Sequence, residues 1–164
     1  MTEILDLQAT EVALPAARVV RAPFACKPDR IGEEAGKAFN VIDWFMNAHH
    51  LIRAGAPSIV YEEYGPSGVK ADALQPIVDD GASPASTRLV YLARLPARRA
   101  LRFIHRGPCR RLGETYDRIG RYLVERGFAD AGQPLATPMW EEYLSDLATT
   151  PPAELLTHVF VPLR

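Results

Sequence analysis

The stretch Trp140-Glu141-Glu142-Tyr143 is the densest group of side chains able to do chemistry, because two carboxylates lie between two aromatic rings. If it is a strand, alternate residues share a face, so Glu141 points with Tyr143 and Glu142 points with Trp140. An ionised carboxylate among aromatic rings attracts a cationic or amphipathic ligand, which the ring faces also bind. A desolvated carboxylate serves instead as a general acid or base. Alternation alone leaves open which glutamate faces inwards, or whether both face solvent and Trp140 lies in the core.

The other polar candidates are isolated. His105 precedes Gly107-Pro108 at the end of an extended stretch, where it is either a structural side chain or a ligand contact. Trp44 lies among polar positions of a helical pattern, so we expect it to cover a sheet edge or the other half of the chain, with ligand contact as the alternative. The histidines have no partners at metal-ligand spacing, and no phosphate loop or nucleotide fingerprint is found. We therefore expect neither a metal nor a cofactor.

The two cysteines, Cys26 and Cys109, each fall where a strand is expected to hand over to a helix. Without a secretory pattern, free thiols are favoured over a disulfide. A helix N-terminus lowers a thiol pKa, so Cys109 beside Arg110 and Arg111 is also a candidate nucleophile. An inert thiol fits better, because no His/Asn partner pattern accompanies it.

The elements that must position these residues come from an internal repeat. Leu14 to Glu33 aligns with Leu95 to Glu114 without a gap, starting at Leu-Pro-Ala and ending at Arg-x-Gly-Glu. Farther on, Tyr61-Glu62-Glu63-Tyr64 echoes the Trp140 stretch. A repeat this long indicates two related half-modules, about 12–79 and about 87–164, within one domain of residues 1–164. Clefts between halves are common sites for small molecules, so we expect a central cleft at their seam.

Each half is expected to run strand, helix, strand, strand. The first half has an extended stretch from Val12 to Phe24, a helix capped by Asp29 and stopped near Gly55, and two strands, Ser58 to Tyr64 and Ala73 to Val78. The second half repeats this order. It begins with two extended stretches on either side of Pro96, Arg88 to Leu95 and Ala100 to His105. A helical stripe from Leu112 to Leu123 follows and ends at Arg126-Gly127, and the last two strands are Met139 to Leu144 and Leu156 to Leu163. Neither half can bury its apolar face alone. The predicted fold is α+β, with tandem pseudo-twofold βαββ modules, a mostly antiparallel sheet and two long helices.

The composition excludes several classes of protein. The formal net charge is −1 and the apolar content is 48%, which gives no general attraction to nucleic acid or to an anionic membrane. Arginines crowd the middle of the chain, but no recognition-helix motif accompanies them. No stretch is long and apolar enough for a membrane span, and no signal peptide is found. We expect a cytoplasmic protein, monomeric or homodimeric, with no direct nucleic-acid or membrane partner.

The segments around the second helix resemble a known family. They are similar to the GyrI-like small-molecule-binding domain, also called the AraC-type effector-binding domain, which carries His-x-Gly-Pro-Tyr before the helix and Glu-x-Tyr-Leu-x-Asp after it. The matching positions here are His105, Gly107, Pro108, Gly127, Glu141, Tyr143, Leu144, Asp146 and Pro162. The resemblance implies two βαββ modules around a central cavity with Glu141 at its floor. The chain departs from the family at Cys109, where Tyr is usual, and we expect no DNA-binding region in it.

This resemblance and the residues together give the functional expectation. We expect a stand-alone protein that binds lipophilic, planar or cationic small molecules, for sequestration, sensing or toxin resistance. The candidate ligand-binding residues are Glu141, Tyr143, Trp140, Tyr61, Phe160, His105 and Trp44. The first alternative is a hydrolase of strained electrophiles in which Glu141 is the general base. The second is a protein-interaction module that acts on a partner such as gyrase.

Overall fold

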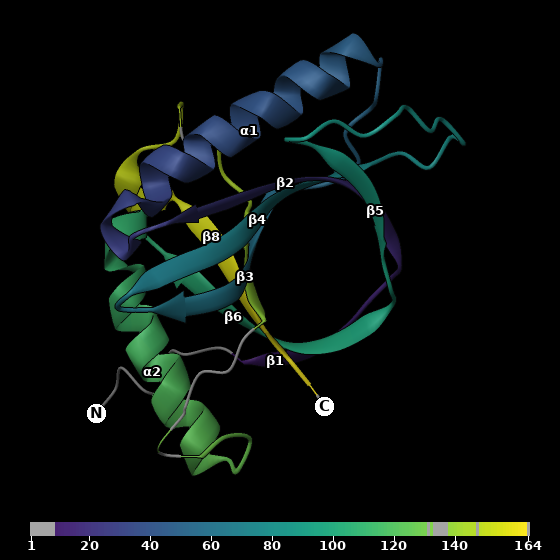
Figure 1. Ribbon diagram of the computed structural model, residues 1–164. Coiled ribbons are helices and arrows are strands. Elements are labelled where there is room, and N and C mark those ends of the chain that lie inside the picture. Colours follow the sequence, from purple (N-terminus) through teal and green to yellow (C-terminus); the bar gives the residue numbers. More distant parts are fainter. Residues whose placement is uncertain (1–8, 131, 133–137, 147, 164) are drawn as a thin grey trace. The chain divides into compact units, whose positions relative to one another are not determined.

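The chain forms two compact units. A computed structural model describes residues 9–130, 132, 138–146 and 148–163. We call Ala13–Arg98 the N-terminal unit, and Met1–Val12 together with Arg99–Arg164 the C-terminal unit. Each unit has one long helix and antiparallel strand pairs (Figure 1). The predicted α+β class, with mostly antiparallel sheet and two long helices, is therefore confirmed. The central cleft stays a prediction.

In the N-terminal unit, one long helix packs on one face of a sheet with the strand order β3-β4-β2-β5. Its elements are β2 (Ala17–Cys26), α1 (Ile31–Ala48), β3 (Ser58–Gly65), β4 (Gly68–Ile77) and β5 (Tyr91–Leu95). The helix lies along β2 and β4 (Figure 1) because its apolar face repeats every three to four residues. The core between helix and sheet consists of Val20, Ala22, Ala38, Ile42, Phe45, Met46, Ala73, Ile77 and Val90.

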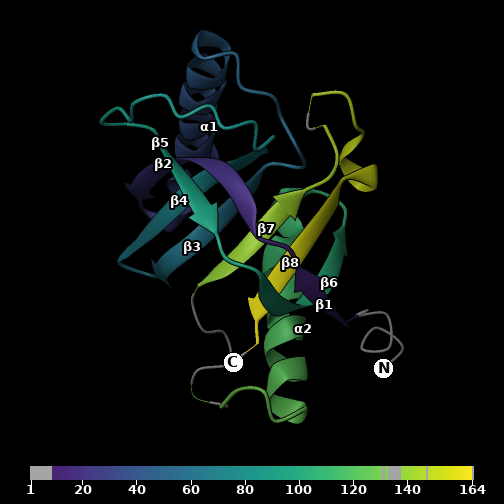
Figure 2. The ribbon, with the colours of Figure 1, turned by 90° about the vertical axis from the view of Figure 1, so that its right-hand side faces the viewer.

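The C-terminal unit repeats this plan with the strand order β1-β6-β8-β7. Its elements are β1 (Thr10–Leu14), which starts in this unit and crosses its boundary, β6 (Arg98–Arg106), α2 (Leu112–Glu125), β7 (Met139–Tyr143) and β8 (Leu156–Pro162). Helix α2 packs against one face of this sheet (Figure 2). The core beneath it consists of Leu101, Phe103, Leu112, Ile119, Leu123, Met139, Val159 and Val161.

The first strand of each half of the sequence joins the sheet of the unit formed mainly by the other half. The first half begins with β1, which neighbours β6, and the second half begins with β5, which pairs with β2. Both switches occur at the repeated Leu-Pro-Ala, residues 14–16 and 95–97. Proline has no N–H to donate to a ladder, so it ends one strand before the next begins. The stretch from Val12 to Phe24, expected to be extended and punctuated by Pro15, is extended, and the break at Pro15 divides it into the two strands β1 and β2.

The ends of α1 differ from expectation. The helix stops at Ala48 rather than near Gly55, because His50 is left-handed with φ of 54°. The N–H of Leu51 then donates to the Met46 carbonyl at 2.9 Å, which closes the helix in a Schellman motif. At the other end Asp29 lies in a 3-10 turn and does not cap the helix. Of the described helices, none is long and apolar enough to cross a membrane.

The turn that joins β6 to α2 depends on one glycine. Gly107 has a φ of +116°, and its N–H donates to the Leu155 carbonyl at 2.8 Å. A Cβ at Gly107 meets nothing within 4 Å, so space does not select glycine there. The backbone conformation does, because side chains disfavour this φ.

Replacing Gly107 by alanine is expected to lower the free energy of unfolding by roughly 1–3 kcal/mol. The matched control is Gly113→Ala in α2, where a Cβ also meets nothing within 4 Å but φ is not positive. That variant should gain roughly 0.5–1 kcal/mol from helix propensity. Urea unfolding of both variants measures the difference, and equal effects would refute the conformational argument.

Candidate functional site

The C-terminal unit contains a buried carboxylate. Glu141 on β7 is only 4% exposed. Its Oε2 accepts a hydrogen bond from the Tyr116 hydroxyl at 2.5 Å, and its Oε1 accepts one from the Tyr143 hydroxyl at 2.6 Å. Hydrogen bonds to an ionised acceptor are short and strong, and they offset the cost of removing a carboxylate from water. Glu141 is thus anchored through both of its oxygens.

The strand register explains why Glu141 is inside. Glu141 pairs with Val159 of β8, and Val159 belongs to the core beneath α2. Side chains of paired residues share a face, so Glu141 points towards α2, which supplies Tyr116. The next residue, Glu142, pairs with His158 on the opposite face and is only half-buried. The expected alternation along this strand is what separates the two glutamates.

His105 on β6 is hydrogen-bonded both to the turn before α2 and to α2 itself. Its Nε2 lies 3.1 Å from the Pro108 carbonyl oxygen, and its Nδ1 lies 2.6 Å from the Thr115 hydroxyl. A carbonyl can only accept, so Nε2 carries a proton and donates it to the Pro108 oxygen. His105 is 5% exposed, and both of its nitrogens are engaged within the unit. This arrangement favours the structural alternative over a ligand contact.

Two of the expected aromatic residues lie on the other face of the same sheet. Trp140 and Phe160 pair directly across β7 and β8, and their rings stack with centroids 5.1 Å apart. Both side chains are buried. Since Glu141 and Tyr143 face α2, the stacked pair does not share their face. The C-terminal unit therefore brings Glu141 together with Tyr143 but not with these two rings.

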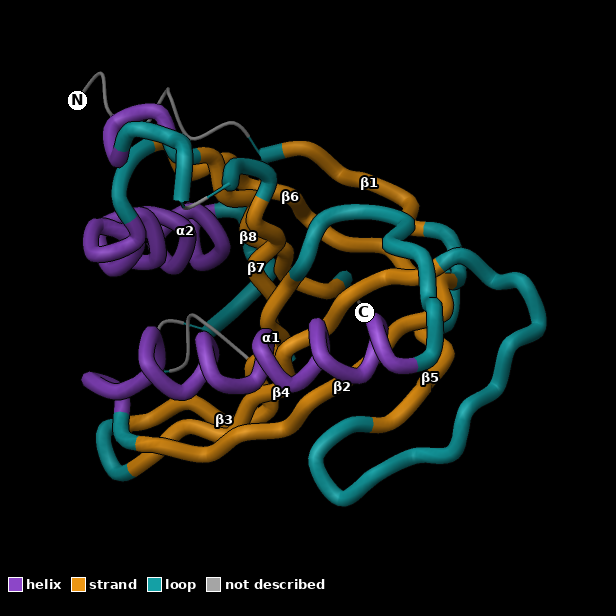
Figure 3. The backbone as a smooth tube through the Cα atoms, turned by 90° about the horizontal axis from the view of Figure 1, so that it is seen from above, coloured by secondary structure: helices purple, strands orange, loops and turns teal. Residues whose placement is uncertain are grey.

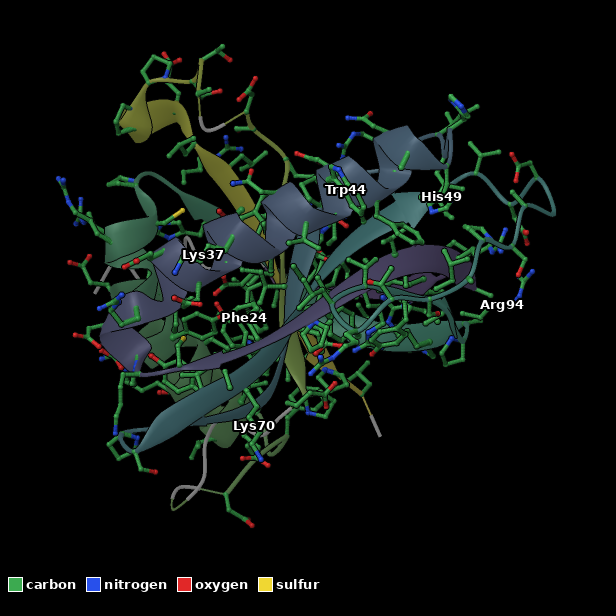
Figure 4. All side chains as sticks on the ribbon, turned by 45° about the horizontal axis from the view of Figure 1, so that its top comes forward. Phe24, Lys37, Trp44, His49, Lys70 and Arg94 are labelled. Atoms are coloured by element: carbon green, nitrogen blue, oxygen red, sulfur yellow. The ribbon has the colours of Figure 1, made fainter. Side chains whose placement is uncertain are left out.

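The remaining two candidates belong to the N-terminal unit. Tyr61 is buried and contacts Tyr64 edge-on, with ring centroids 5.9 Å apart. Trp44 on α1 is 68% exposed (Figure 4), so it does not cover a sheet edge of its own unit as expected, and its packing against the other half stays a prediction. The helix stripe explains this, because Ile42 and Phe45 take the inward positions on either side of it.

The echo of the Trp140 stretch in the first half does not create a second buried acid. A β-bulge falls between Tyr61 and Glu63, where the register against β4 shifts. Tyr61 pairs with Ala71, two residues from Ala73 of the core beneath α1, and therefore faces α1. Glu62 and Glu63 are both exposed. An aromatic ring thus takes the inward position that Glu141 has in the C-terminal unit.

Sequence reasoning missed the role of Tyr116, the helix residue that holds Glu141. Its spacing from Leu112 and Ile119 places Tyr116 in the expected apolar stripe from Leu112 to Leu123. Its hydroxyl was the available signal, since a carboxylate facing a helix needs donors from that helix. Thr115, which bonds His105, was missed in the same way. Two adjacent α2 residues therefore tie this helix to β6 and β7.

Cys109 lies within electrostatic reach of the same carboxylate. Its thiol is free and exposed. Partial burial raises the pKa of Cys109 above the ordinary value, and the negative charge of Glu141 raises it further. The thiolate is the reactive form, so this environment weakens the nucleophile alternative.

The chemistry available in the C-terminal unit is thus a buried carboxylate, two phenol hydroxyls and a nearby thiol. A carboxylate of this kind can hold a cation by its charge, and it can also accept a proton. In the described part of the chain, no three His, Cys, Asp or Glu side chains lie close enough to bind a metal ion.

The Cys109 thiol can report the charge on Glu141. In a Cys26→Ser background, Glu141→Gln is expected to speed alkylation of Cys109 by iodoacetamide roughly two- to fivefold near pH 8, because the thiol pKa falls. Glu142→Gln, which removes the same charge from the opposite face, should leave the rate unchanged. Stopped aliquots analysed by mass spectrometry measure both rates, and equal acceleration in the two variants would contradict the assignment.

Comparisons with known proteins agree with this architecture. The family model of the GyrI-like small molecule binding domain matches residues 68–164. A search of curated proteins gives no significant match. The crystal structure of the EcmrR C-terminal domain has a TM-score of 0.80 at 19% identity, over 96% of this chain and 98% of that one. In a cryo-EM structure of an EcmrR–DNA complex, the match has a TM-score of 0.81 at 18% identity and covers 98% of this chain, which spans 58% of that EcmrR chain.

Two further solved structures share the fold. A hydrolase from Listeria innocua has a TM-score of 0.63 at 13% identity, over 97% of this chain and 93% of that one. SAV2435 bound to tetraphenylphosphonium has a TM-score of 0.56 at 12% identity, over 96% of this chain and 94% of that one. At these identities the structures show the fold alone. Because the family model covers more than half of the 164 residues, the chain belongs to the GyrI-like small molecule binding domain family.

Proposed function

We propose that this protein binds lipophilic, planar or cationic small molecules, with Glu141 as the anionic anchor. The observation that carries the proposal is the burial of Glu141, at 4% exposure, with a tyrosine hydroxyl on each oxygen. Membership of a small-molecule-binding family supports the general role. The anchor and the charge of the ligand are our inference from the geometry.

The two hydroxyls prepare the carboxylate for a cation. They carry no net charge, so their hydrogen bonds stabilise the oxygens but leave the negative charge of Glu141 in place. In a low-dielectric surrounding, that charge attracts a cation more strongly than a carboxylate in water does. The rings of Tyr116 and Tyr143 lie beside it and can add cation–π contacts. A lipophilic cation suits this combination best, because its own desolvation costs little.

Hydrolysis of a strained electrophile is the second candidate. A buried glutamate can act as a general base towards water, and the fold is shared with a hydrolase from Listeria innocua. A carboxylate oxygen can accept more than one hydrogen bond, so a tyrosine hydroxyl on each oxygen does not by itself prevent a water molecule from bonding there. Binding ranks first because Glu141 and its two hydroxyls suffice for it, whereas hydrolysis also needs a placed electrophile.

Tetraphenylphosphonium, the ligand in the SAV2435 structure, is a suitable probe. We expect Glu141→Gln to weaken its binding by roughly tenfold or more, or about 1.4 kcal/mol or more, because the charge is removed. Glu142→Gln is the matched control, since it lies on the same strand and faces the opposite side. Isothermal titration calorimetry measures both affinities.

Tetraphenylborate, which has the same shape and the opposite charge, separates electrostatic anchoring from simple apolar binding. It should bind the native protein more weakly than tetraphenylphosphonium, and Glu141→Gln should narrow that gap. Equal losses in Glu141→Gln and Glu142→Gln would overturn the anchor. A product one water heavier after incubation with a cyclopropane-bearing electrophile, absent with Glu141→Gln, would establish the hydrolase instead.

A further inference from the structure

We propose that the N-terminal unit carries a second binding site, for the carboxylate group of a small molecule, at Arg18 and Arg94. This site uses none of the residues around Glu141, and it does not depend on the function proposed above. Its basis is a pair of arginines that share one counter-charge, one of which is buried with an unused hydrogen-bond donor.

The two arginines are direct neighbours across a strand pair. Arg18 of β2 pairs with Arg94 of β5, so their side chains leave the sheet on the same face. Like charges placed directly opposite each other destabilise a sheet, and the arrangement needs a compensating anion.

One carboxylate serves both guanidinium groups. Asp79 Oδ2 lies 2.8 Å from Arg94 Nη1, whereas Asp79 Oδ1 lies 3.8 Å from Arg18 Nη1. The first distance is a hydrogen bond and the second is too long for one. The hydrogen bond from Arg94, and to a lesser degree the charges of Arg94 and Arg18, hold the pKa of Asp79 below its ordinary value. One negative charge against two positive charges leaves this group with a net positive charge.

Arg18 is the incomplete part of this arrangement. It is 9% exposed, and its Nη1 is buried with no hydrogen-bond partner among the described residues. Leaving a buried charged donor unpaired costs free energy that a correctly placed acceptor recovers. An acceptor at Nη1 is therefore the group that this cluster lacks.

Asp79 is poorly placed to complete the cluster itself. It lies at the start of the long loop between β4 and β5 (Figure 3), and its side chain is 46% exposed. Its backbone ties it to the end of β4, so the carboxylate that bonds Arg94 stops short of Arg18. A free carboxylate has no such tether and can accept from both guanidinium groups, which match its planar geometry. Binding would release Asp79 to the solvent.

This displacement gives the site a distinctive signature. Asp79 acts as an internal competitor, so removing its charge should strengthen binding of an external carboxylate. If the three side chains served only as a structural ion pair network, Asp79→Asn would give no such gain.

The test is a titration with sodium acetate at constant ionic strength, balanced with sodium chloride. The signals of arginine Nε–H groups, followed by NMR, give the dissociation constant. Asp79→Asn is expected to bind acetate at least roughly threefold more tightly, because the competent state is more populated. Arg94→Gln should weaken binding roughly tenfold, since it removes a charged hydrogen-bond donor. Both side chains are well exposed, so both variants should keep the fold, which circular dichroism checks.

Lys70→Gln is the matched control. It removes the same charge from an exposed side chain of β4, near the β3–β4 turn and away from Arg94 (Figure 4). It should bind acetate as the native protein does, and so should Glu141→Gln. Equal weakening in Arg94→Gln and Lys70→Gln, or no gain in Asp79→Asn, would overturn the site. Binding of inorganic phosphate without binding of acetate would overturn the ligand class.

Discussion

A carboxylate removed from water must be hydrogen-bonded, and the geometry of the C-terminal unit follows from meeting this need at Glu141. One donor, Tyr143, comes from the same strand two residues away, which the pleat of β7 provides directly. The other, Tyr116, comes from α2 and requires the helix to lie at a fixed position over the sheet. The adjacent bond between Thr115 and His105 holds the start of that helix to β6. The positive φ of Gly107 lets the chain turn from β6 into the helix at this place.

The sequence predicts those parts of this arrangement that depend on local periodicity. The separation of Glu141 from Glu142 follows from the two-residue period of a strand, and the end of α2 at Arg126-Gly127 follows from the preference of glycine for positive φ. The role of Tyr116 was missed because its partner lies 25 residues away, and spacing along a helix does not reveal which strand residue it meets. The echo at Tyr61 shows the same limit. Sequence similarity to the Trp140 stretch does not reveal the β-bulge that follows Tyr61, nor that Tyr61 faces the helix of its unit while Trp140 faces away from α2.

The sequence also does not predict that the first strand of each half joins the sheet of the other unit. Each Leu-Pro-Ala predicts a break between two strands, but it does not predict which sheet the next strand joins. Only long-range pairing decides this, as between Ala17 of β2 and Leu95 of β5. The consequence is that each unit contains a strand from the other half of the sequence. Neither half of the sequence therefore supplies all the strands of one unit by itself.

Aligned positions of the sequence repeat have different surroundings in the two units. Arg18 aligns with Arg99, yet Arg18 is buried with an unused donor, whereas Arg99 is exposed and bonds Glu11 through Nε at 3.1 Å. The backbone plan is retained in both units, while the partners of the aligned side chains are not. An acid faces the helix in one unit, and an arginine pair lacks a full counter-charge in the other. Because the two groups attract opposite charges, the two proposed sites would differ in the charge of the ligand that each prefers.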